Sequence, residues 1–196
     1  MKLVLASASQ ARQALLANAG LPFVAIPAEL DERAAEQPLI EAAAEAQDVA
    51  IALAAAKAVC VSKEHPQDLV LGADQILTLE GERMTKPANM EAARRQLLRL
   101  SGKTHALHSA VASARNGEPI WQHAETAYLK MRRLTPEDIG HYLAATGSEA
   151  LRSVGAYQIE GRGIQLFDEI SGDYFAILGL PLLPTLAHLR AEGMIE

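Results

Sequence analysis

Apolar residues follow two different patterns along the first half of the chain. Short apolar runs predict buried strands at residues 2–6, 23–26 and 69–79, the last of them interrupted at Gly72–Gln75. Apolar residues three or four positions apart predict helices at residues 11–19 and 39–63. The polar, acidic stretch at residues 27–38 has neither pattern and is predicted to be a loop.

In the second half, a helix is followed by paired strands. Strands are predicted at residues 104–114, 120–131, 164–170 and 174–178, and helices at residues 90–100, 135–145 and 182–191. Asn89 and Thr135 are suitable N-caps for the first two of these helices, and Asn116-Gly117 is a strong hairpin signal between two strands. Alternating strands and helices followed by a hairpin predict an α/β fold with a mixed sheet.

Composition narrows the function classes. A chain of 196 residues with 49% hydrophobic residues is expected to fold as one domain over residues 1–196. Its net charge of −6 argues against duplex nucleic acid and membrane surfaces as partners, so a polyanionic substrate would need a local cluster of Lys and Arg. Cys60 is the only cysteine, and the apolar run near the N-terminus is too short for a signal peptide. We therefore expect a cytoplasmic protein.

The first strand-to-helix turn is a candidate phosphate site. Ser7 and Ser9 lie where a helix is predicted to begin, and Arg12 lies one turn further along. Free backbone N–H groups, hydroxyls and a guanidinium together suit a phosphate group. The alternative interpretation is that Ser9 only caps the helix and that Arg12 is a solvated charge.

Asp74 is the second candidate, because a carboxylate inside an apolar strand is costly unless it is paired or binds a metal. It is interpreted as a metal ligand or general base, or else as a structural Asp at a bulge. Lys57, Lys86 and the pair Asp31-Glu32 carry weaker signals, since each is also typical of a solvated helix or loop charge.

Eight segments resemble, in order, the Maf (septum formation inhibitor) family of nucleoside triphosphate pyrophosphatases. They are LASASQARQALL at residues 5–16, LDE at 30–32, AKA at 56–58, GADQ at 72–75, TKP at 85–87, LSGKTH at 100–105, GAYQIEG at 155–161 and GLPL at 179–182. No single segment is decisive, but the ordered set spans nearly the whole chain and is specific.

The resemblance implies a fold similar to the inosine triphosphate pyrophosphatases, with an elongated twisted mixed sheet, two lobes and a central cleft. It implies hydrolysis of a nucleoside triphosphate to the monophosphate and pyrophosphate, with Mg²⁺ or Mn²⁺ as the cofactor, and a homodimer. Asp74 matches the family's proton acceptor, and with Glu32 it is expected to bind the metal. The residues that match phosphate-binding positions are Ser7, Ser9, Arg12, Lys57 and Lys86.

Three positions concern the base of the nucleotide that the protein is expected to recognise. Family members similar to the 7-methyl-GTP pyrophosphatases carry Gln and Glu at the places of Gln75 and Glu160, whereas Ala11 matches neither that group nor the dTTP/UTP group. A carboxylate at Glu160 suits the two N–H donors of a guanine edge, so we expect 7-methyl-GTP over dTTP or UTP. Cations of the family pattern are missing at Ala11 and Ser153. An inosine or xanthosine triphosphate pyrophosphatase and a nucleotide-binding regulator of cell division without required turnover therefore stay open as alternatives.

Overall fold

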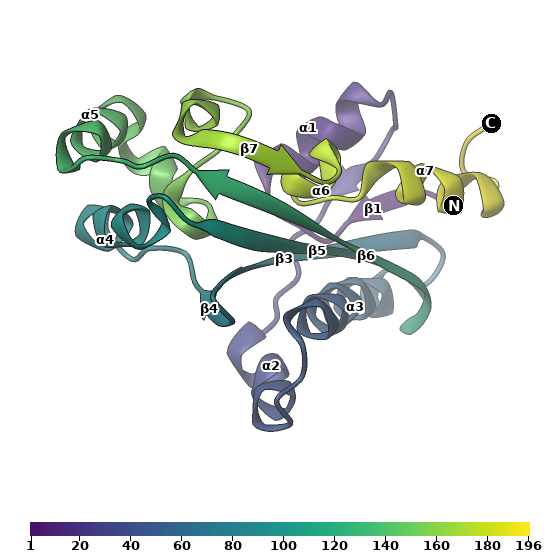
Figure 1. Ribbon diagram of the computed structural model, residues 1–196. Helices are drawn as coiled ribbons and strands as arrows, with labels where there is room; N and C mark the ends of the chain where they lie inside the picture. Colours follow the sequence, from purple (N-terminus) through teal and green to yellow (C-terminus); the bar gives the residue numbers. More distant parts are fainter. The chain divides into compact units, whose positions relative to one another are not determined.

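A seven-stranded mixed sheet runs through the computed structural model, which describes residues 1–196 (Figure 1). The strands are β1 (Leu3–Leu5), β2 (Val24–Ala25), β3 (Leu69–Leu79), β4 (Glu82–Met84), β5 (Thr104–Arg115), β6 (Glu118–Met131) and β7 (Phe167–Ser171). Their order is β2-β1-β3-β5-β6-β7, and β4 pairs with β3. β1 is parallel to β2 and β3, whereas β4 and β7 are antiparallel to their neighbours. The predicted α/β fold with a mixed sheet is confirmed.

Seven α-helices accompany the sheet. They are α1 (Gln10–Asn18), α2 (Glu32–Glu41), α3 (Ala46–Glu64), α4 (Met90–Leu100), α5 (Pro136–Thr146), α6 (Tyr174–Ile177) and α7 (Leu182–Ala191). Three 3₁₀ turns, η1 (Gly147–Leu151), η2 (Val154–Ala156) and η3 (Arg162–Leu166), follow α5. None of these helices combines the length and the apolarity needed to span a membrane.

The chain forms two compact units. The first consists of Met1–Gln75, His108–Glu125 and Asp173–Glu196, and the second of Ile76–Leu107 and Thr126–Gly172. Strands β3, β5 and β6 each contribute residues to both units. The expectation of a single domain over the whole chain stays a prediction.

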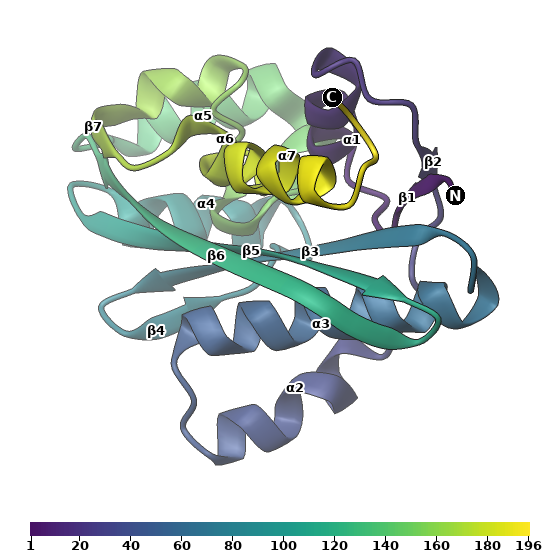
Figure 2. The ribbon, with the colours of Figure 1, turned by 90° about the vertical axis from the view of Figure 1, so that its right-hand side faces the viewer.

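In the first unit, alternate residues of β1 and β3 serve two separate cores. Leu3, Leu5, Leu69, Leu71 and Ala73 pack with residues of α1 and α7, whereas Val4, Ala6 and Val70 pack with residues of α3. Figures 1 and 2 show α3 on one face of these strands and α1, α6 and α7 on the other. Because side chains alternate along a strand, Gly72 and Asp74 face α3, and Gln75 faces the side of α1, α6 and α7.

Gly72 lies directly against helix α3. A Cβ atom on Gly72 would lie 2.6 Å from the backbone nitrogen of Ala58 and closer still to the carbonyl oxygen of Ala54. Real side chains do not tolerate such distances, so the approach of β3 to α3 requires glycine at this position. The result is that the α3 turn between Ala54 and Ala58 lies directly against the backbone of β3.

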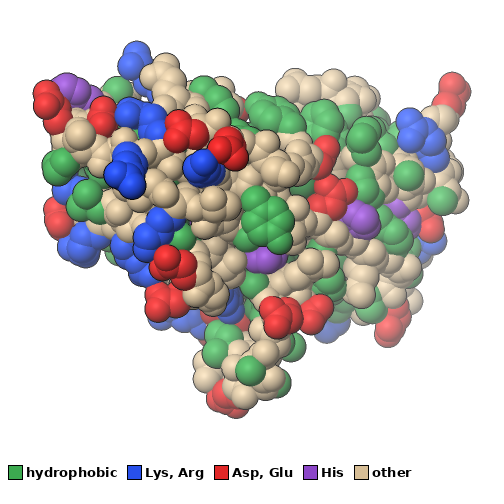
Figure 3. Space-filling view, viewed as in Figure 1, with side chains coloured by type: hydrophobic (Ala, Val, Ile, Leu, Met, Phe, Trp, Pro, Cys, Tyr) green, Lys and Arg blue, Asp and Glu red, His purple; other side chains and the backbone are tan.

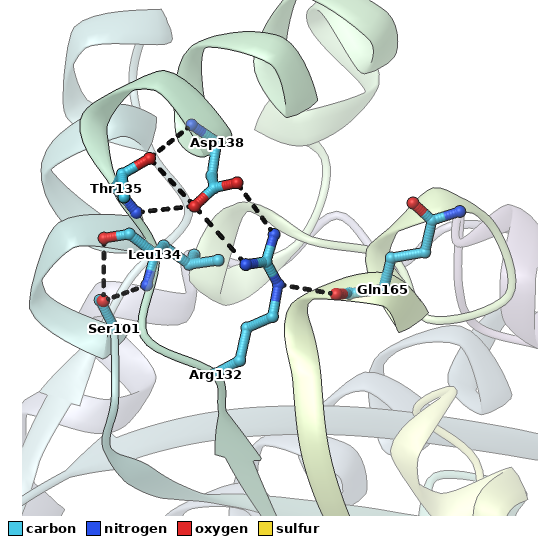
Figure 4. A network of polar contacts seen from close by, with 6 residues as sticks. All are labelled: Ser101, Arg132, Leu134, Thr135, Asp138 and Gln165. Carbon is cyan, nitrogen blue, oxygen red and sulfur yellow. Dashed lines mark hydrogen bonds and ion pairs between the residues drawn. The ribbon is translucent and has the colours of Figure 1, made fainter.

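In the second unit, one polar network joins the ends of four segments (Figure 4). Thr135 caps α5 and forms a capping box with Asp138, whose other contact is the Arg132 guanidinium at 3.2 Å. Arg132 Nε donates to the Gln165 carbonyl at 3.1 Å, and the backbone N–H of Leu134 donates to Ser101 Oγ at 2.8 Å. Hydrogen bonds from the Thr135 backbone and from Arg132 lower the pKa of Asp138 to about 2, so the capping carboxylate is charged at neutral pH.

Most predicted elements are confirmed within one or two residues. The strand predicted at 164–170 begins only at Phe167, since residues 162–166 form η3, and three further predictions are wrong. Residues 32–41 form α2 rather than a loop, because the Asp31 side chain accepts from the Ala34 N–H at 3.1 Å and caps the helix. The predicted helix at 39–63 is broken near Ala43, where φ is +53°, so α3 begins at Ala46. Residues 39–41, the first three of that predicted helix, belong to α2.

The third error concerns residues 174–178, which form the short helix α6 in place of a strand. Asp173 Oδ1 accepts from the Ala176 N–H at 2.8 Å and caps this helix. An apolar run of only four or five residues does not distinguish helix from strand by its pattern. In addition, β3 is continuous through Gly72–Gln75, so Asp74 lies in a regular strand and not at an interruption.

The contact at Gly72 predicts a strong response to one added methyl group. Gly72→Ala should lower the free energy of unfolding by about 1–3 kcal/mol or more, the usual cost of overpacking a dense core. Urea denaturation measures this effect. Gly140→Ala is the matched control, because Gly140 lies inside α5 with nothing closer to an added Cβ than Arg94 Nη2 at 3.8 Å. Glycine is a poor helix former, so this control should be neutral or stabilising. Equal losses in both variants would contradict the packing argument.

Candidate functional site

Lys57 connects two carboxylates in the first unit. Its Nζ lies 2.6 Å from Asp74 Oδ1 and 2.9 Å from Glu32 Oε1. The side chains of Lys57 and Asp74 are each 11% exposed, while that of Glu32 is 55% exposed. The buried carboxylate in the apolar strand is therefore paired, and one ammonium group holds two carboxylates close together.

Local structure explains why these three side chains meet. Lys57 lies in the α3 turn that packs against Gly72, and Asp74 is the next residue of β3 that faces the same helix. Glu32 is the first residue of α2, directly after the capping residue Asp31. Because α2 packs on α3, its first turn reaches Lys57.

Arg12 is held mainly by backbone carbonyl groups. Its Nε donates to the Gly179 oxygen at 2.8 Å, and its Nη1 donates to the Ala73 oxygen at 2.8 Å and to Ser7 Oγ at 3.3 Å. Burial lowers the pKa of the guanidinium, and the carboxylates of Asp74 and Glu32 oppose this effect. Its Nη2 has no hydrogen bond within the chain, and it is not buried away from solvent. This end of Arg12 can therefore donate to an anion.

Ser7 and Ser9 both take part in the turn before α1. Ser9 is the N-cap and accepts from the Arg12 N–H at 3.4 Å, as the capping interpretation predicted. Ser7 is buried, and its hydroxyl oxygen accepts from the Ser9 N–H at 3.2 Å and from Arg12. Arg12 is thus part of a hydrogen-bonded turn and not a solvated charge.

Gln75 lies next to Asp74 in sequence but on the other face of β3. Its Nε2 contacts Ser109 Oγ at 2.8 Å and the carbonyl oxygens of Ala176 and Ile177 at 3.2 and 2.9 Å. All of its hydrogen bonds therefore go to the α6 side, away from Lys57. Ala11 is half-buried in the second position of α1.

Lys86 and Glu160 belong to the second unit, and both are exposed. Glu160 lies in a segment that is tightly held at Tyr157, whose hydroxyl is 2.6 Å from His105 Nε2 and whose ring packs edge-on against Phe167. Burial lowers the pKa of His105 to about 4, so this histidine is neutral at physiological pH. The residues around Glu160 thus form an ordered structure in their own unit.

Charge is divided unevenly between the units. The second unit holds 11 of the 18 Lys and Arg residues but only 9 of the 24 acidic residues, which gives it a formal charge of +2 against −8 for the first. Figure 3 shows Lys and Arg side chains gathered where α4 and α5 lie in Figure 1. The net excess of cations in the chain is therefore in the second unit.

Comparison with known proteins identifies the family. The model of the Maf-like protein family matches residues 2–192. The chain belongs to the Maf-like family.

Several Maf-like relatives align along their whole length. A 7-methyl-GTP pyrophosphatase of Mesorhizobium japonicum is 55% identical over all of this chain and 98% of its own. A protein of the same name from Brucella suis is 56% identical, again over all of this chain and 98% of its own. A nucleoside triphosphate pyrophosphatase of Rhodopseudomonas palustris is 53% identical over 98% of this chain and 95% of its own.

The structure brings together part of the predicted Maf-like site and adds groups that the sequence did not indicate. Six predicted residues lie in the first unit and form two contact groups: Ser7, Ser9 and Arg12 in the turn before α1, and Lys57, Asp74 and Glu32 around the Lys57 ammonium. The carbonyl oxygens of Ala73 and Gly179 and the hydroxyl of Ser109 were missed. The pattern of side chains in a sequence does not predict which backbone carbonyl groups accept hydrogen bonds. Only the segment GLPL indicated Gly179.

The Lys57 contacts predict an asymmetric response to charge removal. Lys57→Met should lower the free energy of unfolding by about 3–5 kcal/mol, because it leaves the buried Asp74 carboxylate unpaired. Glu32→Gln is the control and should cost less than about 1 kcal/mol, since that partner is largely exposed. Adding Asp74→Asn to Lys57→Met should restore part of the loss. Denaturation of the wild type, these three variants and Asp74→Asn alone tests this, and strictly additive losses would exclude a coupled pair.

Proposed function

We propose that this protein hydrolyses a nucleoside triphosphate to the monophosphate and pyrophosphate, with 7-methyl-GTP preferred over dTTP and UTP. The observation that carries the proposal is the group in the first unit in which Lys57 joins Asp74 and Glu32. The charges of these carboxylates act on the Arg12 guanidinium, whose Nη2 has no hydrogen bond within the chain. The names of the Maf-like relatives support both the reaction and the base.

Mg²⁺ or Mn²⁺ is the proposed cofactor, with the carboxylates of Glu32 and Asp74 as its protein ligands. Both carboxylates contact the same Lys57 ammonium, so one cationic group already joins them in the first unit. Nowhere in the chain do three or more His, Cys, Asp or Glu side chains gather into a metal-binding group. Magnesium commonly uses only one or two carboxylates together with substrate phosphates and water, so this donor set fits it. When bound, such a cation neutralises and polarises phosphate oxygens.

The residues of the chain would then divide the remaining work. Asp74, which Lys57 contacts at 2.6 Å, would orient a water molecule and accept its proton. That water adds to phosphorus, and the anhydride bond between the α- and β-phosphates breaks to release pyrophosphate. Arg12 and Lys57 offset the phosphate charge, while the hydroxyls of Ser7 and Ser9 border the turn that carries Arg12.

A nucleotide panel with Mg²⁺ and Mn²⁺ tests the reaction. Wild-type protein should release pyrophosphate, and Asp74→Asn should reduce turnover by roughly 10²- to 10⁴-fold, the usual contribution of a general base. Urea denaturation should show that Asp74→Asn remains folded. Near-normal turnover by Asp74→Asn would remove this residue from the mechanism. Far faster turnover of ITP or XTP would select that alternative, and binding without any turnover would favour a regulator.

Recognition of the base is tested at Glu160. A carboxylate accepts from the two N–H donors of a guanine edge, whereas the amide of Glu160→Gln sets its own N–H groups against them. Activity on 7-methyl-GTP should fall by about 10- to 100-fold, the effect of leaving buried donors poorly paired, while activity on UTP holds. Glu137→Gln, on an exposed residue of α5, is the matched control. Equal losses on both nucleotides would assign Glu160 to the phosphates or to folding.

A further inference from the structure

The amide nitrogen of Gln75 is fully engaged by acceptors from another part of the first unit. It contacts Ser109 Oγ on β5 and the carbonyl oxygens of Ala176 and Ile177 at the end of α6. An amide NH₂ group has two hydrogens to donate, and here three acceptors surround it. Gln75 therefore has no N–H left for a nucleotide.

The chemistry of these partners fixes the orientation of the amide. Backbone carbonyl groups only accept hydrogen bonds, so the opposite orientation would place the Gln75 oxygen against two other oxygens. The last carbonyl groups of a helix lack partners within it and require donors from elsewhere. Gln75 supplies such a donor to α6, and Ser109 Oγ supplies a second one to the Ala176 oxygen at 2.6 Å.

The segment held in this way also holds Arg12. The turn at residues 176–179 is closed by a hydrogen bond from the Gly179 N–H to the Ala176 oxygen at 2.8 Å. The Gly179 oxygen at its end accepts from Arg12 Nε at 2.8 Å. Gln75 and Arg12 thus bind opposite ends of one four-residue turn.

We propose that Gln75 and Ser109 are positioning residues, which hold the turn at 176–179 and through it set the Arg12 guanidinium. The proposal deepens the proposed function and rests on it, in that Arg12 serves the phosphates of the substrate. It gives Gln75 a different role from direct contact with the base. Gln75 and Asp74 face opposite sides of β3, so Gln75 does not contact the phosphate site directly. The turn at 176–179 connects Gln75 to that site.

This role predicts a defect that does not depend on the base. Gln75→Ala should lower kcat/KM by about 3- to 10-fold on 7-methyl-GTP and on UTP alike, the range expected for loss of one anchoring hydrogen bond. Ser109→Ala should act in the same direction. In an Arg12→Ala background, Gln75→Ala should have little further effect, because the group that it positions is gone. Gln122→Ala, which removes an exposed strand glutamine of the same unit, is the matched control.

A second measurement does not require turnover. The Arg12 Nε–H signal in a ¹⁵N-resolved NMR spectrum, assigned with Arg12→Lys, should exchange slowly with water in the wild type and quickly in Gln75→Ala. Continued protection in Gln75→Ala would overturn the proposal, as would a changed preference between 7-methyl-GTP and UTP at normal rates, or losses that add to those of Arg12→Ala. Faster exchange in a protein that hydrolyses no nucleotide would uphold the positioning role and refute the proposed function.

Discussion

The close approach of β3 to α3 at Gly72 is the constraint on which the first unit depends. With no Cβ atom in the way, the backbone of the strand lies against the helix turn that carries Lys57. Two residues further along the same face, Asp74 is then within hydrogen-bonding distance of that lysine. Glu32 joins them because α2 packs on α3. Because Gly72 has no side chain, the buried Asp74 carboxylate lies next to Lys57. Without that partner, burial of the carboxylate would be strongly unfavourable.

Strand alternation gives β3 two separate tasks. On one face, Asp74 contacts Lys57 of α3, which also contacts Glu32 of α2. On the other, Gln75 meets only neutral acceptors from β5 and α6. The two residues are adjacent in sequence, yet their surroundings differ in charge, in partners and in the helices that supply them. A central strand can in this way connect groups on both sides of a sheet without any direct contact between them.

Sequence predicted those features that depend on local chemistry. The caps at Asn89 and Thr135 and the hairpin at Asn116-Gly117 are confirmed, because each rests on a few neighbouring residues. Asp31 and Asp173 cap helices that were missed, since a capping Asp looks the same as a loop Asp. The candidate residues were found mainly through resemblance to the family. The partners of Arg12 could not be found, because they are carbonyl groups far apart in the chain.

The backbone partners of Arg12 bear on how this protein can diverge. No substitution removes a carbonyl oxygen, so the two shortest contacts of the guanidinium depend on the path of the main chain at positions 73 and 179. Gly179 itself has a φ of +99°, and an added Cβ there would lie 3.3 Å from Arg12 Nε. Arg12 thus has these contacts although the cation of the family pattern is missing at Ala11, just before it. Divergence that reaches this group must act on the path of the main chain, through insertions, deletions or shifts of a turn. The position of the Arg12 charge therefore depends on the fold more than on the residues next to Arg12 in the sequence.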